Sequence, residues 1–171
     1  MSGSQLEAEY EGMVDRHELY AKYGIAAEAA QLFETELSTM LLCLRALEND
    51  WHIVPDPQRA GAALREIDQK TLGRLIRDLR PYMNLDEVTE ARFVSALDAR
   101  NKLIHGFFER HNFKIQTDDG RNEMLADLEG LHEQLFQAWQ IASSITTTIG
   151  ELIGDPRRTI RSWFGNGPSR E

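Results

Sequence analysis

The chain has 171 residues, of which 42% are hydrophobic and 27% charged, and this is the usual composition of a single globular domain. Its formal net charge of −9 argues against promiscuous nucleic-acid binding, and no apolar run approaches the roughly 18 residues that a transmembrane helix needs. The acidic N-terminus is unlike a secretory signal and the single cysteine, Cys43, cannot form an internal disulfide, so we expect a cytoplasmic protein.

The first two segments are predicted to be helical. Residues 1–24 are expected to form an acidic N-terminal helical extension that ends at a break or bend at Gly24. From residue 25 to 49 apolar side chains recur at intervals of three and four, which predicts a long amphipathic helix. The expected core positions of this helix are Ala26, Ala29, Ala30, Phe33, Leu37, Met40, Leu41, Leu44 and Leu47.

A proline-containing loop and a second helix are expected next. Pro55 and Pro57 are expected to keep residues 50–61 from forming a helix, because proline lacks an N–H group and has a fixed φ. The second helix is predicted over residues 62–79, with a restart at Thr71.

The third and fourth helices complete the predicted fold. The third is expected to be capped by Asn84 or Asp86 and to end near Arg110, with Phe93, Leu97, Ile104 and Phe108 as its inner stripe and Ala96, Leu103 and Phe107 beside it. The fourth is predicted over residues 122–152, and residues 154–171 form a tail that we expect to be mobile. The expected core of the fourth helix is Met124, Leu128, Leu131, Leu135, Ala138, Ile141 and Ile145.

The third helix contains the one group of residues that indicates chemistry. Arg100, Asn101 and His105 lie within one and a half turns and interrupt an otherwise apolar helix. A guanidinium, an amide and an imidazole together suit a phosphate better than they suit a protein core. We expect these three residues to be the catalytic ones.

This Arg-x4-His spacing with an adjoining asparagine resembles the signature of the HEPN superfamily. The resemblance covers roughly residues 25–150 and implies an all-α, up-down four-helix bundle, here with an extra N-terminal helix before the domain at residues 25–153. It also implies a metal-independent endoribonuclease of bacterial toxin-antitoxin or defence systems, a homodimer, and an antitoxin or other protein partner. No cofactor or metal is expected. Arg45 and His52, with six residues between them, match the looser pattern Arg-x4–6-His, but their segment runs into Trp51 and Pro55.

The geometry of an ideal helix predicts that Arg100 and His105 diverge. Five residues correspond to about 140° around the axis, so one protomer alone would not bring the two side chains together. In the HEPN family two motif helices meet across a two-fold axis and line one cleft. The resemblance therefore implies a composite site, in which the RNA 2′-hydroxyl attacks the adjacent phosphorus and leaves a 2′,3′-cyclic phosphate.

Basic residues gather in the middle of the chain. Residues 51–117 carry 11 basic and 9 acidic groups, whereas residues 1–50 carry 3 and 10. Lys70, Arg74 and Arg77 have the spacing of one helix face, and with Lys102 they are candidate RNA-binding residues. A solvated face balanced by neighbouring acids explains the same spacing.

Two alternatives to the nuclease stay open. His105 and Gly106 have the pattern of a helix C-terminus, in which case Arg100 would be a surface residue paired with an acid. A non-catalytic helical dimerisation module is the other reading of the resemblance. Phe107 stands where many HEPN toxins have a tyrosine that their antitoxin modifies, so that route of neutralisation is not expected here.

Overall fold

The computed structural model describes the backbone of residues 3–154 and the side chains of residues 16–151, 153 and 154. Every regular element in this part of the chain is helical, which confirms the all-α class. In chain order the elements are α1 (Gly3–Glu48), α2 (Pro57–Ile67), α3 (Leu72–Leu79), α4 (Glu87–His111), the short 3₁₀ helix η1 (Asn112–Gln116) and α5 (Asp118–Leu152).

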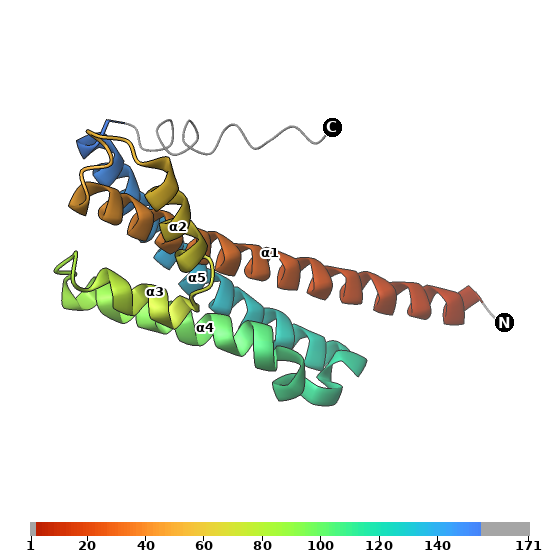
Figure 1. Cartoon of the computed structure of the whole chain (residues 1–171). Helices are drawn as coiled ribbons and strands as arrows, with labels where there is room; N and C mark the ends of the chain where they lie inside the picture. The colour runs from red at the N-terminus through yellow and green to blue at the C-terminus, as the bar shows by residue number, and fades with distance from the viewer. Residues whose placement is uncertain (1–2, 155–171) are drawn as a thin grey trace, which may run out of the picture.

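Three long helices, α1, α4 and α5, form the body of the molecule (Figure 1). α5 lies along α1, α4 packs against both, and the short helices α2 and α3 cover the C-terminal half of α1. Their shared core is continuous and contains Phe33, Leu37, Met40, Phe93, Leu103, Leu128 and Leu135, all at 0 or 1% exposure. Over residues 3–154 no helix combines the length and apolar character needed to cross a bilayer.

α1 is one uninterrupted helix, so the predicted break at Gly24 is wrong. A glycine inside a helix costs only about 1 kcal/mol relative to alanine. Packing on both sides of Gly24 offsets this cost, because Leu19 is fully buried before it and Ala26 after it. The extension predicted at residues 1–24 is therefore the first part of α1, and this part extends beyond the other helices in Figure 1.

Pro57 starts a helix instead of preventing one, which corrects the predicted loop at residues 50–61. Proline suits the first turn of a helix because the N–H group that it lacks has no partner there. The Asp56 carboxylate caps this turn by accepting a hydrogen bond from the Arg59 amide at 3.0 Å. The predicted restart at Thr71 is confirmed, because residues 68–71 separate α2 from α3.

α4 begins as predicted, with Asp86 accepting hydrogen bonds from the amides of Val88 and Thr89. Its buried stripe, however, is rotated from the predicted one. The buried residues are Phe93, Ala96, Ala99, Leu103, Phe107 and His111. Ile104 and Phe108, predicted to be inner positions, are 39% and 41% exposed. The sequence has apolar residues on two neighbouring faces of this helix. Only the packing against α1 and α5 determines which of the two faces is buried.

α5 begins at Asp118, four residues before the predicted Asn122, because Thr117 caps it by accepting a hydrogen bond from the Gly120 amide. The predicted core positions Met124, Leu128, Leu131, Leu135 and Ala138 are buried, which confirms them, whereas Ile141 and Ile145 are half-buried. The predicted mobile tail lies outside the described residues beyond Gly154.

The connection from α4 to α5 is tightly built around Gly120. A Cβ atom at this position would overlap the carbonyl oxygen of Lys114. Arg121, which is 4% exposed, donates a hydrogen bond to the Ile115 carbonyl at 3.0 Å. Asn112 has a φ of 39°, in the left-handed region where the chain turns out of α4. The connection therefore fixes the angle between the two helices.

Gly120→Ala is expected to destabilise the protein by about 1–3 kcal/mol, the usual cost of forcing an atom into a packed site. Gly130→Ala is the matched control, because Gly130 is also in α5 and nothing lies within 4 Å of its added Cβ. This control should stabilise by about 0.5–1 kcal/mol, since alanine is the better helix former. Urea unfolding midpoints check both changes, and equal effects of the two substitutions would contradict this account of the connection.

Candidate active site

The three motif residues lie on one open surface of α4. Asn101 and His105 are exposed, and Arg100 is half-buried at the edge that faces α1. The helix continues past Gly106 as far as His111, because Phe107 remains in the core on the next turn. The interpretation of His105 and Gly106 as a helix end is therefore wrong.

The motif side chains meet within one protomer, contrary to the predicted divergence. Nη1 of Arg100 lies 3.0 Å from Nε2 of His105 and 3.3 Å from Oδ1 of Asn101. The separation of about 140° describes the Cα–Cβ directions of the two residues, whereas an arginine side chain is long enough to reach across a helix turn. A second copy is not needed to bring a guanidinium to this imidazole.

The contact fixes the tautomer of a neutral His105. Every guanidinium nitrogen is a donor and none can accept, so Nε2 of His105 must accept the hydrogen bond from Arg100. The proton of the neutral ring then lies on Nδ1. The side chain therefore has its basic nitrogen at the guanidinium, the group that attracts a phosphate.

Glu34 of α1 lies near Nη2, the second terminal nitrogen of the Arg100 guanidinium. Its Oε2 lies 3.8 Å from Nη2 of Arg100, and both side chains are partly covered, at 33% and 25% exposure. The planar guanidinium is thus held between a carboxylate on one side and the His105–Asn101 pair on the other. Glu34 could not be predicted from the sequence, because nothing in the chain indicates which α1 residue faces Arg100.

The predicted basic stripe is interrupted. Lys70 lies in the turn between α2 and α3, so it does not share a helix with Arg74 and Arg77 as predicted. Its ammonium contacts Glu66 and Asp78 at 2.9 Å each, and its side chain is 13% exposed. Arg74, Arg77 and Lys102 are exposed, and none of the three forms an ion pair within the described residues.

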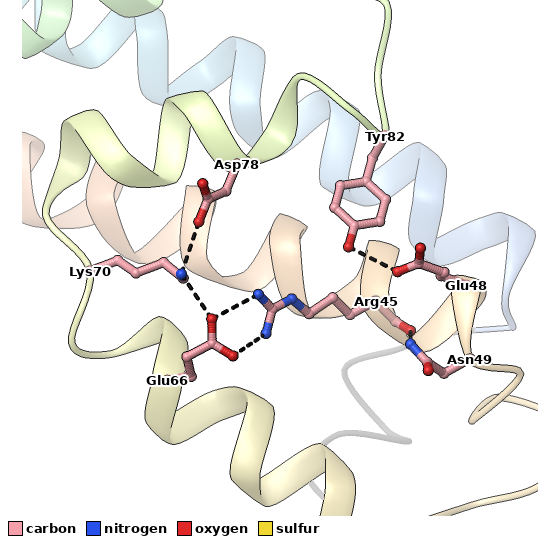
Figure 2. Close-up of polar contacts among 7 residues, drawn as sticks. All are labelled: Arg45, Glu48, Asn49, Glu66, Lys70, Asp78 and Tyr82. Atoms are coloured by element: carbon pink, nitrogen blue, oxygen red, sulfur yellow. Dashed lines mark hydrogen bonds and ion pairs between the residues drawn. The ribbon is translucent and has the colours of Figure 1, made fainter.

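Lys70 belongs to a polar network of Arg45, Glu66, Lys70 and Asp78 that ties α1 to α2 and α3 (Figure 2). Arg45 donates to both oxygens of Glu66, at 2.9 and 3.0 Å. The hydrogen bonds from Arg45 and then Lys70 lower the pKa of Glu66 to about 2. The hydrogen bond to Asp78, followed by that to Glu66, raises the pKa of Lys70.

The network also distinguishes the pair Arg45 and His52 from the pair Arg100 and His105, although both pairs match the motif pattern. Arg45 is bound by Glu66 in a fork, and His52 is in the turn after α1 with Nδ1 3.5 Å from the Ala46 carbonyl oxygen. The two side chains make no contact with each other in the structure. Arg100 and His105 are in contact and His105 is exposed, so they form the better candidate site.

No group of three or more histidine, cysteine, aspartate or glutamate side chains that could hold a metal ion occurs within the part of the chain that the structure describes. Comparison with protein-family models, with curated proteins and with solved structures finds no match for this chain. A function can therefore be inferred only from the residues of this chain and their contacts.

Glu66→Gln is expected to make the free energy of unfolding less dependent on pH in the acidic range. The pKa of Glu66 is about 2 in the folded protein, below its ordinary 4.5, so its stabilising contribution is present above pH 4.5 and is lost as the pH falls towards 2. Because Glu66 is 56% exposed, solvent screening limits this contribution to about 1 kcal/mol or less. Urea unfolding of wild type and variant across this pH range measures the difference, and a gap that stays constant at every pH would refute the assignment.

Proposed function

We propose that this protein is a metal-independent endoribonuclease of the toxin-antitoxin or defence type, with Arg100, Asn101 and His105 at its active site. The observation that carries the proposal is the contact of an exposed imidazole with a guanidinium at 3.0 Å, on a surface open to a polymer. A phosphodiester needs a cation for its charge and a base for the attacking hydroxyl, and these two side chains supply both.

The proposed reaction begins when a substrate phosphate displaces His105 from the Arg100 guanidinium. A guanidinium binds phosphate through parallel N–H groups more strongly than it binds a neutral imidazole. Displacement frees Nε2 of His105, which then takes the proton of the adjacent 2′-hydroxyl. The 2′-oxygen forms a bond to phosphorus while the bond from phosphorus to the 5′-oxygen breaks.

Charge and protons balance without a metal ion. Arg100 stabilises the negative charge that builds up on the phosphoryl oxygens, and Asn101 orients the phosphate or the imidazole. The departing 5′-oxygen gains a proton, from water or from a second imidazole, and leaves as a hydroxyl. The products are a 2′,3′-cyclic phosphate and a 5′-hydroxyl end.

The surrounding charges support an RNA substrate of limited length. Arg74 and Arg77 on α3 and Lys102 on α4 are exposed cations without an ion pair in the described residues. In the proposed complex these cations contact phosphates on either side of the cleaved one. The acidic remainder of the chain disfavours extended nonspecific contact.

A non-catalytic helical interaction module is the second candidate, and a specific observation favours it. α4 exposes Val94, Ile104 and Phe108 at 39 to 43%, on the helix that carries the motif. Exposed apolar side chains on one helix are common where two proteins meet. In this function the same surface would bind a second copy or another protein, and Arg100 and His105 would have no chemical role.

His105→Ala is expected to lower RNA cleavage at least about 100-fold, because a positioned acid–base group contributes that much or more. Since His105 is exposed, the free energy of unfolding should change by no more than about 0.5 kcal/mol. Arg100→Ala should also abolish cleavage, whereas His17→Ala, which removes another exposed histidine, should not. The assay follows a labelled RNA in excess EDTA and identifies the cyclic phosphate end.

Two results would count against this function. Wild-type protein that leaves tRNA, mRNA and short oligonucleotides intact has no nuclease activity to explain. Cleavage that stops in EDTA and returns with a divalent ion requires a different mechanism.

We also expect a homodimer that joins the outer faces of two α4 helices, near Val94, and sets two Arg100–His105 pairs beside one another. Light scattering at tens of micromolar should give about twice the 19.5 kDa of one chain. Val94→Lys should yield monomers, because a charge in an apolar interface costs several kcal/mol. A wild-type monomer that still cleaves RNA would show that one protomer is sufficient.

A further inference from the structure

An aromatic cluster lies beside the motif, between α1 and the C-terminal half of α4. Tyr23 packs against Phe107 and Phe108, with ring centroids 5.7 and 5.2 Å away, and Tyr20 lies 6.3 Å from Phe108. Phe107 is buried, but Phe108 is 41% and Tyr20 54% exposed. The cluster therefore has an inner part in the core and two outer rings in contact with solvent.

The outer rings are continuous with the candidate active site. Phe108 follows His105 by three residues and Ile104 by four, and residues at these spacings are neighbours on a helix surface, with Cβ atoms about 5–6 Å apart. Side chains on a helix also lean towards its N-terminus, which directs Phe108 towards the turn that carries His105.

Packing holds the Phe108 ring in place. Tyr23 lies against it on the α1 side and donates a hydrogen bond from its hydroxyl to the Leu103 carbonyl oxygen at 3.4 Å. Phe107 meets the same ring edge-on, with centroids 5.2 Å apart. A ring that is already ordered loses little conformational entropy when a ligand stacks on it.

Resting on the ribonuclease function above, we propose that Tyr20 and Phe108 form a stacking platform for the base of a nucleotide next to the phosphate bound by Arg100 and His105. Each nucleotide base has a flat aromatic face, and stacking on exposed protein rings is the common way of holding single strands. A base inside a duplex is already stacked on its neighbours and is not available to such a platform. The substrate is therefore single-stranded RNA.

The test measures binding separately from cleavage. The probe is a short single-stranded oligonucleotide with 2′-O-methyl ribose, which has no free 2′-hydroxyl to attack, and its binding is followed by fluorescence anisotropy. Phe108→Leu and Tyr20→Leu keep an apolar side chain but remove the ring. Phe113→Leu is the matched control, because Phe113 is 70% exposed and makes no ring contact with the cluster.

Loss of a stacked base should weaken binding about 5- to 100-fold for Phe108→Leu and Tyr20→Leu, while Phe113→Leu binds like wild type. A duplex of the same sequence should bind more weakly than the single strand. Thermal unfolding verifies that all variants are folded, and Tyr20→Leu, which changes the more exposed ring, keeps the test valid if Phe108→Leu is unstable.

The outcomes distinguish this proposal from the ribonuclease function. If wild type binds the probe through Tyr20 and Phe108 but cleaves no RNA, the platform stands as a single-strand binding site and the nuclease function fails. If cleavage depends on His105 but both ring variants bind and cleave like wild type, the platform fails alone. The platform also fails if wild type binds no single strand, or if Phe108→Leu converts a dimer to monomers, since a second copy then covers the rings.

Discussion

The packing of α1 along α5 is the constraint on which the rest of the molecule depends. α1 and α5 make the most extensive contact between any two helices described, and both bury small side chains. Ala26, Ala29 and Ala30 on α1 and Ala138 and Ala142 on α5 are at most 3% exposed. Small side chains let two helix backbones approach closely, and larger residues such as Phe33 and Leu135 then fill the core around them. α4 packs against both helices.

The position of the motif follows from how α4 packs against α1 and α5. Phe93 packs against Phe33 of α1 with centroids 5.4 Å apart, and near the other end Nε2 of His111 lies 2.8 Å from a carboxylate oxygen of Asp127 on α5. These two contacts fix the rotation of α4 about its axis. With that rotation Arg100 reaches the α1 edge and Glu34, while Asn101 and His105 face solvent.

Ion pairing decides which cations remain for a ligand. Arg45 and Lys70 are committed to Glu66 and Asp78, and Arg110 is paired with Asp127 at 3.0 Å. Arg45 with Glu66 joins α1 to α2, Lys70 with Asp78 joins the turn after α2 to α3, and Arg110 with Asp127 joins α4 to α5. Arg100 differs from them, because its nearest contacts are an imidazole and an amide, and its carboxylate neighbour lies 3.8 Å away. A phosphate can therefore compete for Arg100 more easily than for Arg45.

The sequence by itself determined the helical class, most helix bounds and the identity of the motif, because these depend on local properties. Apolar spacing, the Asp86 cap and the Arg100, Asn101 and His105 spacing in α4 are all readable within one or two helix turns. Tertiary structure decided which arc of α4 is buried, that Glu34 faces Arg100 and that Lys70 is paired with Asp78. Each of these depends on residues that only packing brings together, so Ile104 and Phe108, apolar like the core residues beside them, remain at the surface next to His105.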